Sequence, residues 1–329
     1  MEKIGITTTI PVEIIFAANK IPVDLNNIFI SHSAPEQLIN QAEQNGFPRT
    51  TCCWIKGLYS TAINEGINKI VAVMEGDCSN THSLSEIWND KGIEIIPFSY
   101  PYNKDYKILK NNIEKLMSYF HVDFHKVGKT KKKIDKIRKK LKIIDCLTYE
   151  ENLVTGFENH IFLVSASDFQ SNIYLFEKKI DDFLQQIKNR KPFNESVRLG
   201  LIGVPPIITN LYEEIERFGA RIVFNEVQRQ FAMIDEYSDI VEQYLAYTYP
   251  YSVFDRIKDV EKEIELRNID GIIHYVQAFC HRNIQDSIFK KYLKVPVLTL
   301  EGDRPGDLDE RNRIRIESFI DMILAKKGG

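Results

Sequence analysis

Two cysteines follow the same kind of segment in the two halves of the chain. Cys78 comes shortly after the apolar run 68–74, and Cys280 comes shortly after the apolar run 268–276. In both halves a helix-like stretch and a second apolar run follow. Such alternation predicts parallel strands, and open α/β sheets bind their ligands at the carboxyl ends of these strands. We therefore expect Cys78 and Cys280 to lie on facing walls of one cleft.

Cys52 is a third candidate, because it follows the turn signal 46–51 and opens an apolar, helix-like stretch. The N–H groups and the macrodipole at a helix start favour a thiolate, so we expect a lowered pKa at this thiol. The thiolate is also the form that binds iron or zinc. Its neighbour Cys53 is the alternative ligand, since two adjacent cysteines do not easily bind one tetrahedral ion. Burial without any chemistry is the competing interpretation for each single cysteine.

The spacing of these cysteines bears on the kind of metal site. Structural zinc sites usually use close pairs such as C-x-x-C, which this chain lacks. His82 and His281 lie close in sequence to Cys78 and Cys280, so a mixed Cys/His zinc site stays open. Dispersed single cysteines fit an iron–sulfur cluster better, because each thiolate there binds one iron. Three thiolates would leave a fourth iron open for substrate, water or another ligand.

The elements that must position these cysteines are also repeated. The segment 4–25 predicts a strand, a helix that begins at a proline, and a second strand, and the segment 199–224 repeats this order. We expect an α/β fold with two Rossmann-like, doubly wound lobes of parallel sheet, related by internal duplication. Apolar residues at helical spacing predict a helical segment between them. The expected divisions are an N-terminal lobe, a helical bridging segment and a C-terminal lobe at residues 1–104, 105–196 and 197–329.

Bulk properties exclude several classes of protein. The chain has 329 residues, a formal net charge of −3 and 43% hydrophobic residues, which is ordinary for a globular protein and does not favour a nucleic-acid binder. No apolar run approaches the roughly 20 residues that span a bilayer, and the first residues lack a signal-peptide pattern. Five cysteines are an odd number for a disulfide framework. We expect a cytoplasmic protein that does not bind a membrane.

Together these features give a specific resemblance. The chain resembles the superfamily of 2-hydroxyacyl-CoA dehydratases and benzoyl-CoA reductases, which includes the 2-hydroxyglutaryl-CoA dehydratase D-component and the double-cubane cluster proteins. The resemblance is carried, in the family's order and over nearly the whole chain, by residues 5–15, 52–56, 76–79, 267–273, 279–280, 301–303 and 313–320.

The resemblance implies a cofactor and its ligands. Three cysteines in this family hold an iron–sulfur cluster between the two lobes, and Cys52, Cys78 and Cys280 match them, with Cys53 as the small neighbour of the first. The cluster would be a 4Fe-4S cluster or a double cubane shared across a dimer. Cys146 has no counterpart and is expected to be part of a helical core. Glu13, at the start of the first predicted helix, is a candidate group near the cluster.

The resemblance also implies partners and a reaction. A separate ATP-hydrolysing activator, itself an iron–sulfur protein, would supply a low-potential electron, and the subunit would pair with its own copy or with a paralogous second subunit. The reaction would be the ketyl-radical dehydration of a 2-hydroxyacyl-CoA or the reduction of a small substrate. The alternative is a protein without catalysis: a cluster carrier, an electron-transfer subunit or a zinc-stabilised two-lobed binding protein.

Overall fold

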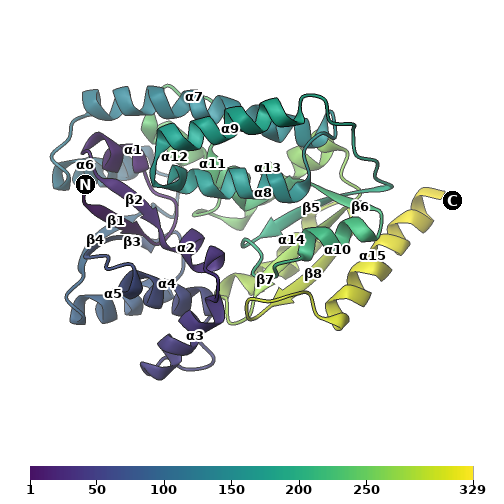
Figure 1. The fold of residues 1–329 in the computed structure, drawn as a ribbon, viewed down its shortest axis with the longest axis horizontal. Helices are drawn as coiled ribbons and strands as arrows, with labels where there is room; N and C mark the ends of the chain where they lie inside the picture. The colour runs from purple at the N-terminus through teal and green to yellow at the C-terminus, as the bar shows by residue number, and fades with distance from the viewer. Residues whose placement is uncertain (329) are drawn as a thin grey trace.

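The computed structural model describes residues 1–328 and contains two parallel sheets of four strands each. Both sheets have the same strand order, in which the second strand of each half lies at one edge and the fourth at the other. This confirms the expected α/β fold with two similar lobes, which lie side by side in Figure 1. The strands in sheet order are β2 (Ile21–Asp24), β1 (Lys3–Ile6), β3 (Lys69–Glu75) and β4 (Glu94–Ser99), then β6 (Ala220–Asn225), β5 (Val197–Gly203), β7 (Gly271–Gln277) and β8 (Val297–Gly302).

The central strands β3 and β7 are apolar because helices cover both of their faces. All seven residues of β7 are buried, and in β3 the run 70–73 is buried without interruption. A parallel sheet that is covered on both faces needs this continuous apolar pattern rather than an alternating one. The runs that predicted these strands therefore also identified the two sheet centres.

The helices of each lobe connect successive strands. Helix α10 starts at Leu211, four residues later than the sequence pattern predicts, because residues 204–207 form an irregular segment that contains two consecutive prolines. Helices of the N-terminal half are α1 (Val12–Ala17), α2 (Leu25–Ser31), α3 (Pro35–Gln44), α4 (Cys53–Asn64) and α5 (Asn80–Asp90). Those of the C-terminal half are α10 (Leu211–Arg217), α11 (Glu226–Ala232), α12 (Ile240–Ala246), α13 (Val253–Arg267), η3 (His281–Gln285), α14 (Asp286–Tyr292) and α15 (Glu310–Gly328).

A layer of helices from the middle of the chain crosses both lobes at the top of Figure 1. Helix α7 joins the two lobes through buried ion pairs. Its Arg138 binds Glu13 of α1 at 2.7 Å, and its Asp145 binds Arg267 of α13 at 2.6 Å. The elements of this layer are α6 (Tyr106–Tyr119), α7 (Phe124–Tyr149), α8 (Gly156–Val164), the short helices η1 (Ser165–Ser167) and η2 (Phe169–Ser171), and α9 (Ile173–Ile187). The exact division at residues 104 and 196 stays a prediction.

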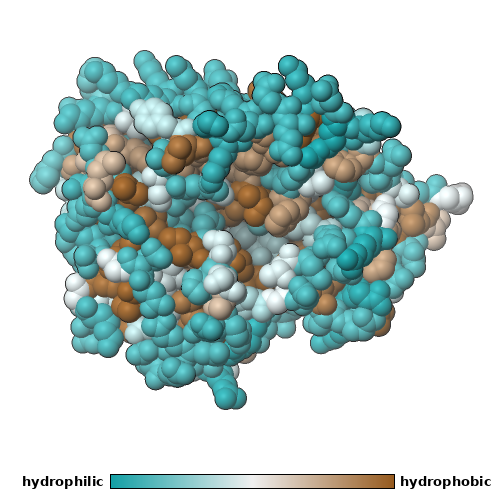
Figure 2. Space-filling model, viewed as in Figure 1, coloured by the Kyte–Doolittle hydropathy of each residue, from teal (hydrophilic) through white to brown (hydrophobic). Residues whose placement is uncertain are grey.

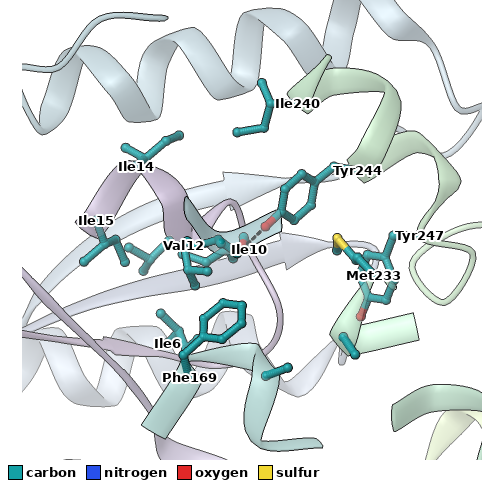
Figure 3. Close-up of a cluster of buried hydrophobic side chains, with 14 of the residues drawn as sticks. Ile6, Ile10, Val12, Ile14, Ile15, Phe169, Met233, Ile240, Tyr244 and Tyr247 are labelled. Carbon is teal, nitrogen blue, oxygen red and sulfur yellow. Dashed lines mark hydrogen bonds between the residues drawn. The ribbon is translucent and has the colours of Figure 1, made fainter. Parts of the chain in front are cut away.

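The largest apolar core also contains residues from both halves. Figure 3 shows Met233, Ile240, Tyr244 and Tyr247 packed near the end of β1 and the start of α1, with Phe169 of η2 beside them. The Tyr244 hydroxyl donates a hydrogen bond to the backbone carbonyl of Ile10 at 2.8 Å. This shared core packs the two lobes against each other.

None of the helices within residues 1–328 is both long and apolar enough to span a bilayer.

Candidate functional site

A cavity of about 490 Å³ lies between the carboxyl ends of the two sheets. Thr7, Asp24 and Asp77 line it at the ends of β1, β2 and β3, and Val204 and Gln277 line it at the ends of β5 and β7. Helix α8 and the turn after it form a third wall of the cavity, which includes His160, Ile161 and Asp168. Figure 2 shows apolar side chains gathered along the middle of this face of the molecule. The position agrees with the rule that open α/β sheets bind ligands beyond the carboxyl ends of their strands.

Three cysteines from three separate segments line this cavity: Cys52, Cys78 and Cys280. The expectation that Cys78 and Cys280 share one cleft is therefore confirmed. Cys53 does not line the cavity; its Sγ lies 3.8 Å from a carboxylate oxygen of Asp303. Cys146 is partly buried in α7 with its Sγ 3.8 Å from the Tyr149 hydroxyl, and it also lies outside the cavity lining.

The three cavity cysteines have the same local setting. Cys52 directly precedes α4, Cys78 lies two residues before α5, and Cys280 directly precedes η3. Each thiol lies next to the backbone N–H of the residue two positions further on, and this N–H lowers the thiol pKa. Free N–H groups at a helix start produce this arrangement, because the first turn has no internal partners for them.

The expectation of a lowered thiol pKa is nevertheless wrong. Burial raises the pKa of Cys52 and of Cys78 to about 12, and it also raises the pKa of Cys280. Cys280 and Cys78 each add to the rise in the pKa of Cys52, and Cys280 adds to that of Cys78, so the three side chains are near one another. The N–H groups oppose both effects without overcoming them. Burial therefore favours the protonated form of each thiol.

The possible donor atoms of the cavity come from separate segments. Among the described residues, no three His, Cys, Asp or Glu side chains are close enough together to hold a single metal ion. His281 lines the cavity beside Cys280, whereas His82 does not line it. Three thiols that face one cavity from separate loops fit a group in which each thiolate binds its own metal atom.

Glu13 does not line the cavity, and the expectation that it lies near a cluster stays a prediction. Its carboxylate is fully buried and accepts hydrogen bonds from Arg138, Gln243 and Tyr244 at 2.7 to 3.0 Å. Burial alone would raise its pKa, but Arg138 and the hydrogen bonds hold it below the usual value. It is a structural anion that binds α1 to α7 and α12.

The fold and this cavity agree with the comparison to known families. The family model described as 2-hydroxyglutaryl-CoA dehydratase, D-component, matches residues 7–323. The chain belongs to this family. A search of curated proteins gives no match. The dehydratase-family resemblance expected from the separate motifs is thus confirmed over nearly the full chain, and Cys52, Cys78 and Cys280 all lie within the matched range.

Several cavity residues of this dehydratase-family chain were missed by the sequence reasoning. Asp24 and Asp168 are buried side by side, with the backbone N–H of Asp24 donating to Asp168 Oδ2 at 2.8 Å. Burial raises the pKa of both carboxyls, that of Asp168 to about 7. Asp24 could have been found as a polar residue at a strand end. Asp168 gave no signal, because its strained turn, with Gln170 at φ +49°, has no distinctive sequence.

His160 and Arg282 were missed as well. The Nδ1 atom of His160 lies 2.8 Å from the side-chain amide of Gln228, and burial lowers the pKa of His160 to about 4, so the ring is neutral at pH 7. Arg282 stacks on the Tyr249 ring at 4.2 Å. It also opposes the burial that raises the pKa of Asp77 to about 6. Arg282 follows Cys280 by two residues, and this proximity was its only sequence signal.

Proposed function

We propose that Cys52, Cys78 and Cys280 hold an iron–sulfur cluster in the cavity between the lobes. The observation that carries the proposal is the convergence of these three cysteines, from separate loops, on one cavity at the carboxyl ends of both sheets. Metal ligation also explains why buried thiols with raised pKa values line a cavity, because binding a cation releases their protons. The N–H group beside each sulfur would then hydrogen-bond to a thiolate.

The proposed reaction is the dehydration of a 2-hydroxyacyl-CoA, as the family's description suggests. Cys52, Cys78 and Cys280 would hold the cluster, which would supply electrons one at a time and would have one iron without a cysteine ligand. The substrate loses its hydroxyl group and a proton as water, so the electron that starts the reaction is returned at its end. The apolar part of the lining, with Trp54, Leu58 and Phe231, would exclude water and surround the acyl chain.

We include two partners in the proposal. The dehydration needs a low-potential electron to start. We assign the supply of this electron to a separate ATP-hydrolysing activator, as in the family that the chain resembles. A second subunit, either a copy of this chain or a paralogue, would pair with it. Sedimentation of the anaerobically purified protein, alone and with candidate activators, tests both associations.

Metal analysis tests the cluster directly. Protein purified without oxygen should contain iron and acid-labile sulfide, and Cys52→Ser, Cys78→Ser and Cys280→Ser should each lose most of the iron. Cys146→Ser is the matched control, because Cys146 lies outside the cavity, and it should retain the iron. Retention in Cys52→Ser with loss in Cys53→Ser would reverse the choice between these neighbours. Zinc without sulfide would overturn the cluster and favour a zinc-stabilised binding protein.

A second measurement separates catalysis from electron carriage. The iron-containing protein is reduced with titanium(III) citrate and mixed with a 2-hydroxyacyl-CoA, and the formation of enoyl-CoA is followed by chromatography. Product formation beyond one equivalent supports the dehydratase. Reduction of the cluster, seen in its electron paramagnetic resonance signal, without product from any tested thioester would favour a cluster carrier.

A further inference from the structure

The cavity has more negative than positive charge among its lining side chains. Three carboxyl groups line it, those of Asp24, Asp77 and Asp168. Of the described residues that line it, only Arg282 has a permanent positive charge, and none is a lysine. His160 is neutral because burial lowers its pKa to about 4. An acyl group that enters this cavity therefore meets an acidic surface.

Arg282 is already occupied by protein groups. Its guanidinium donates to the backbone carbonyl of Gly76 at 3.2 Å and lies 4.2 Å from the centre of the Tyr249 ring. Asp77, the residue after Gly76, lies near Arg282, and the positive charge of Arg282 attracts its carboxylate. A carboxylate on a substrate would have to displace these contacts before it could pair with Arg282.

Within the described part of the chain, no positively charged side chain pairs with the carboxyl groups of Asp24 and Asp168. Both side chains are less than 5% exposed, and no ion pair within residues 1–328 involves either of them. Their hydrogen-bond donors are uncharged: the Ser167 hydroxyl, the Asn26 side chain and backbone N–H groups. Burial raises the pKa of both carboxyls, so this site already disfavours negative charge. A third carboxylate beside the pair would lose its water without gaining a cation, and any charge on the pair would repel it.

The rest of the lining is suited to an apolar chain. Trp54 and Leu58 of α4 face the cavity from one lobe, and Ile161, Val164 and Phe231 face it from α8 and α11. Contact with these side chains stabilises a hydrocarbon group by removing its surface from water. It gives no compensation for the desolvation of a charged group.

We propose that this cavity selects a 2-hydroxyacyl group with an apolar or uncharged side chain and discriminates against one that ends in a carboxylate. The inference rests on the proposed function and makes it more specific. It separates this chain from the glutaryl substrate in the description of its family, since a 2-hydroxyglutaryl group ends in a carboxylate.

Binding of two matched thioesters tests the inference. Pentanoyl-CoA and glutaryl-CoA have the same five-carbon chain and differ in a terminal methyl group or carboxylate, and neither has the 2-hydroxyl needed for reaction. Their affinities for the anaerobically purified protein are measured by calorimetry. We expect pentanoyl-CoA to bind at least about tenfold more tightly. Equal or tighter binding of glutaryl-CoA would overturn the inference but leave the cluster and the reaction intact, whereas binding of neither thioester would overturn the acyl-CoA function itself.

Two variants connect the selectivity to its cause. Asp24→Asn removes one carboxyl of the buried pair, and its amide oxygen can still accept from Asn26 while Ser167 turns to accept from the amide nitrogen. Asp168→Asn removes the other carboxyl. Each variant should bring the two affinities closer by strengthening the binding of glutaryl-CoA several-fold.

Asp123→Asn is the control, because Asp123 lies at the exposed start of α7, outside the cavity. It removes a carboxyl there and should leave the ratio of the two affinities unchanged. An unchanged ratio in the first two variants, with pentanoyl-CoA still bound, would show that Asp24 and Asp168 do not determine the selectivity.

Discussion

Arg282 donates a hydrogen bond from its guanidinium to the backbone carbonyl of Gly76, across the boundary between the two lobes, at 3.2 Å. Arg282 lies two residues after Cys280, and Gly76 lies two residues before Cys78. This single contact therefore connects the loops that position two of the three cavity thiols. Gly76 itself is tightly held, with φ at +95° and with Pro250 and Tyr100 only 2.8 Å from the place where a Cβ would lie.

The first prediction concerns this connection. Arg282→Gln removes the hydrogen bond and the stacking on Tyr249, so we expect the iron of the purified protein to pass to a chelator roughly tenfold faster, as for the loss of about 1.4 kcal/mol. The rate is measured by the absorbance of the iron–chelator complex. Arg304→Gln is the matched control, because Arg304 also joins the lobes, through Glu36 and Glu43, but does not line the cavity. Equal rates in both variants would contradict a specific function of Arg282.

The second prediction concerns the buried carboxylate of Glu13. Glu13→Ala leaves Arg138 buried without its main partner, so the free energy of unfolding should fall by about 3–5 kcal/mol. Urea unfolding measures this change. The same substitution at Glu114, which forms an exposed ion pair with Lys110, should cost less than about 1 kcal/mol. Iron content per folded chain should not change in Glu13→Ala, and a loss of iron would support Glu13 as a group near the cluster.

The sequence was sufficient for the parts of the site that depend on local pattern. Continuous apolar runs predicted the buried strands, and the strand-end rule then placed Cys78 and Cys280 in one cleft. Cys52 could be added because turn residues and an apolar stretch predicted the start of a helix there. All three predictions rest on neighbours in the chain, so they do not need knowledge of tertiary packing.

The rest of the site depends on contacts between distant residues. Asp24 and Asp168 are 144 positions apart and meet only because η2 packs against β2. The pKa of Cys52 was predicted with the wrong sign because the sequence shows the helix start but not the depth of burial, which has the larger effect. The ion pair of Glu13 could not be predicted for a similar reason, since its partner Arg138 lies 125 positions away.

The third prediction uses the close packing behind Cys52. A Cβ at Gly57 of α4 would lie 2.4 Å from the ring of Phe29, which is fully buried in α2. Gly57→Ala must therefore displace Phe29 and, with it, Trp54, whose ring lies 5.4 Å from that of Phe29. We expect a loss of about 1–3 kcal/mol in unfolding free energy and less iron per chain, because Cys52 directly precedes this helix.

Gly128→Ala is the control for this substitution. Gly128 lies within α7 with no atom within 4 Å of the new Cβ, so alanine should be neutral or stabilise the protein by up to about 1 kcal/mol through its helix propensity. If Gly57→Ala unfolds at the same urea concentration as the wild type and keeps its iron, the packing of α2 on α4 does not position Cys52.

The last prediction is a pH dependence that comes from His160. Burial lowers its pKa from 6.5 to about 4 in the folded state. Above pH 6.5 neither the folded nor the unfolded chain binds a proton at this ring, so stability does not change. As the pH falls from 6.5 to 4, the unfolded chain binds the proton and the folded chain does not, so stability falls. Below pH 4 both states are protonated and the effect ends.

Comparison with His160→Asn isolates this effect, because the asparagine oxygen can accept from Gln228 near the former Nδ1 position but does not titrate. The pKa of Asp168, raised to about 7, gives the opposite pH dependence, but both proteins share it. Urea unfolding at several pH values between 7 and 4 should show the wild type losing stability relative to the variant, by up to about 1 kcal/mol per pH unit since His160 is partly exposed. Parallel pH profiles would mean that His160 takes up its proton without unfolding, and the neutral ring that lines the cavity would then become a cation at mildly acidic pH.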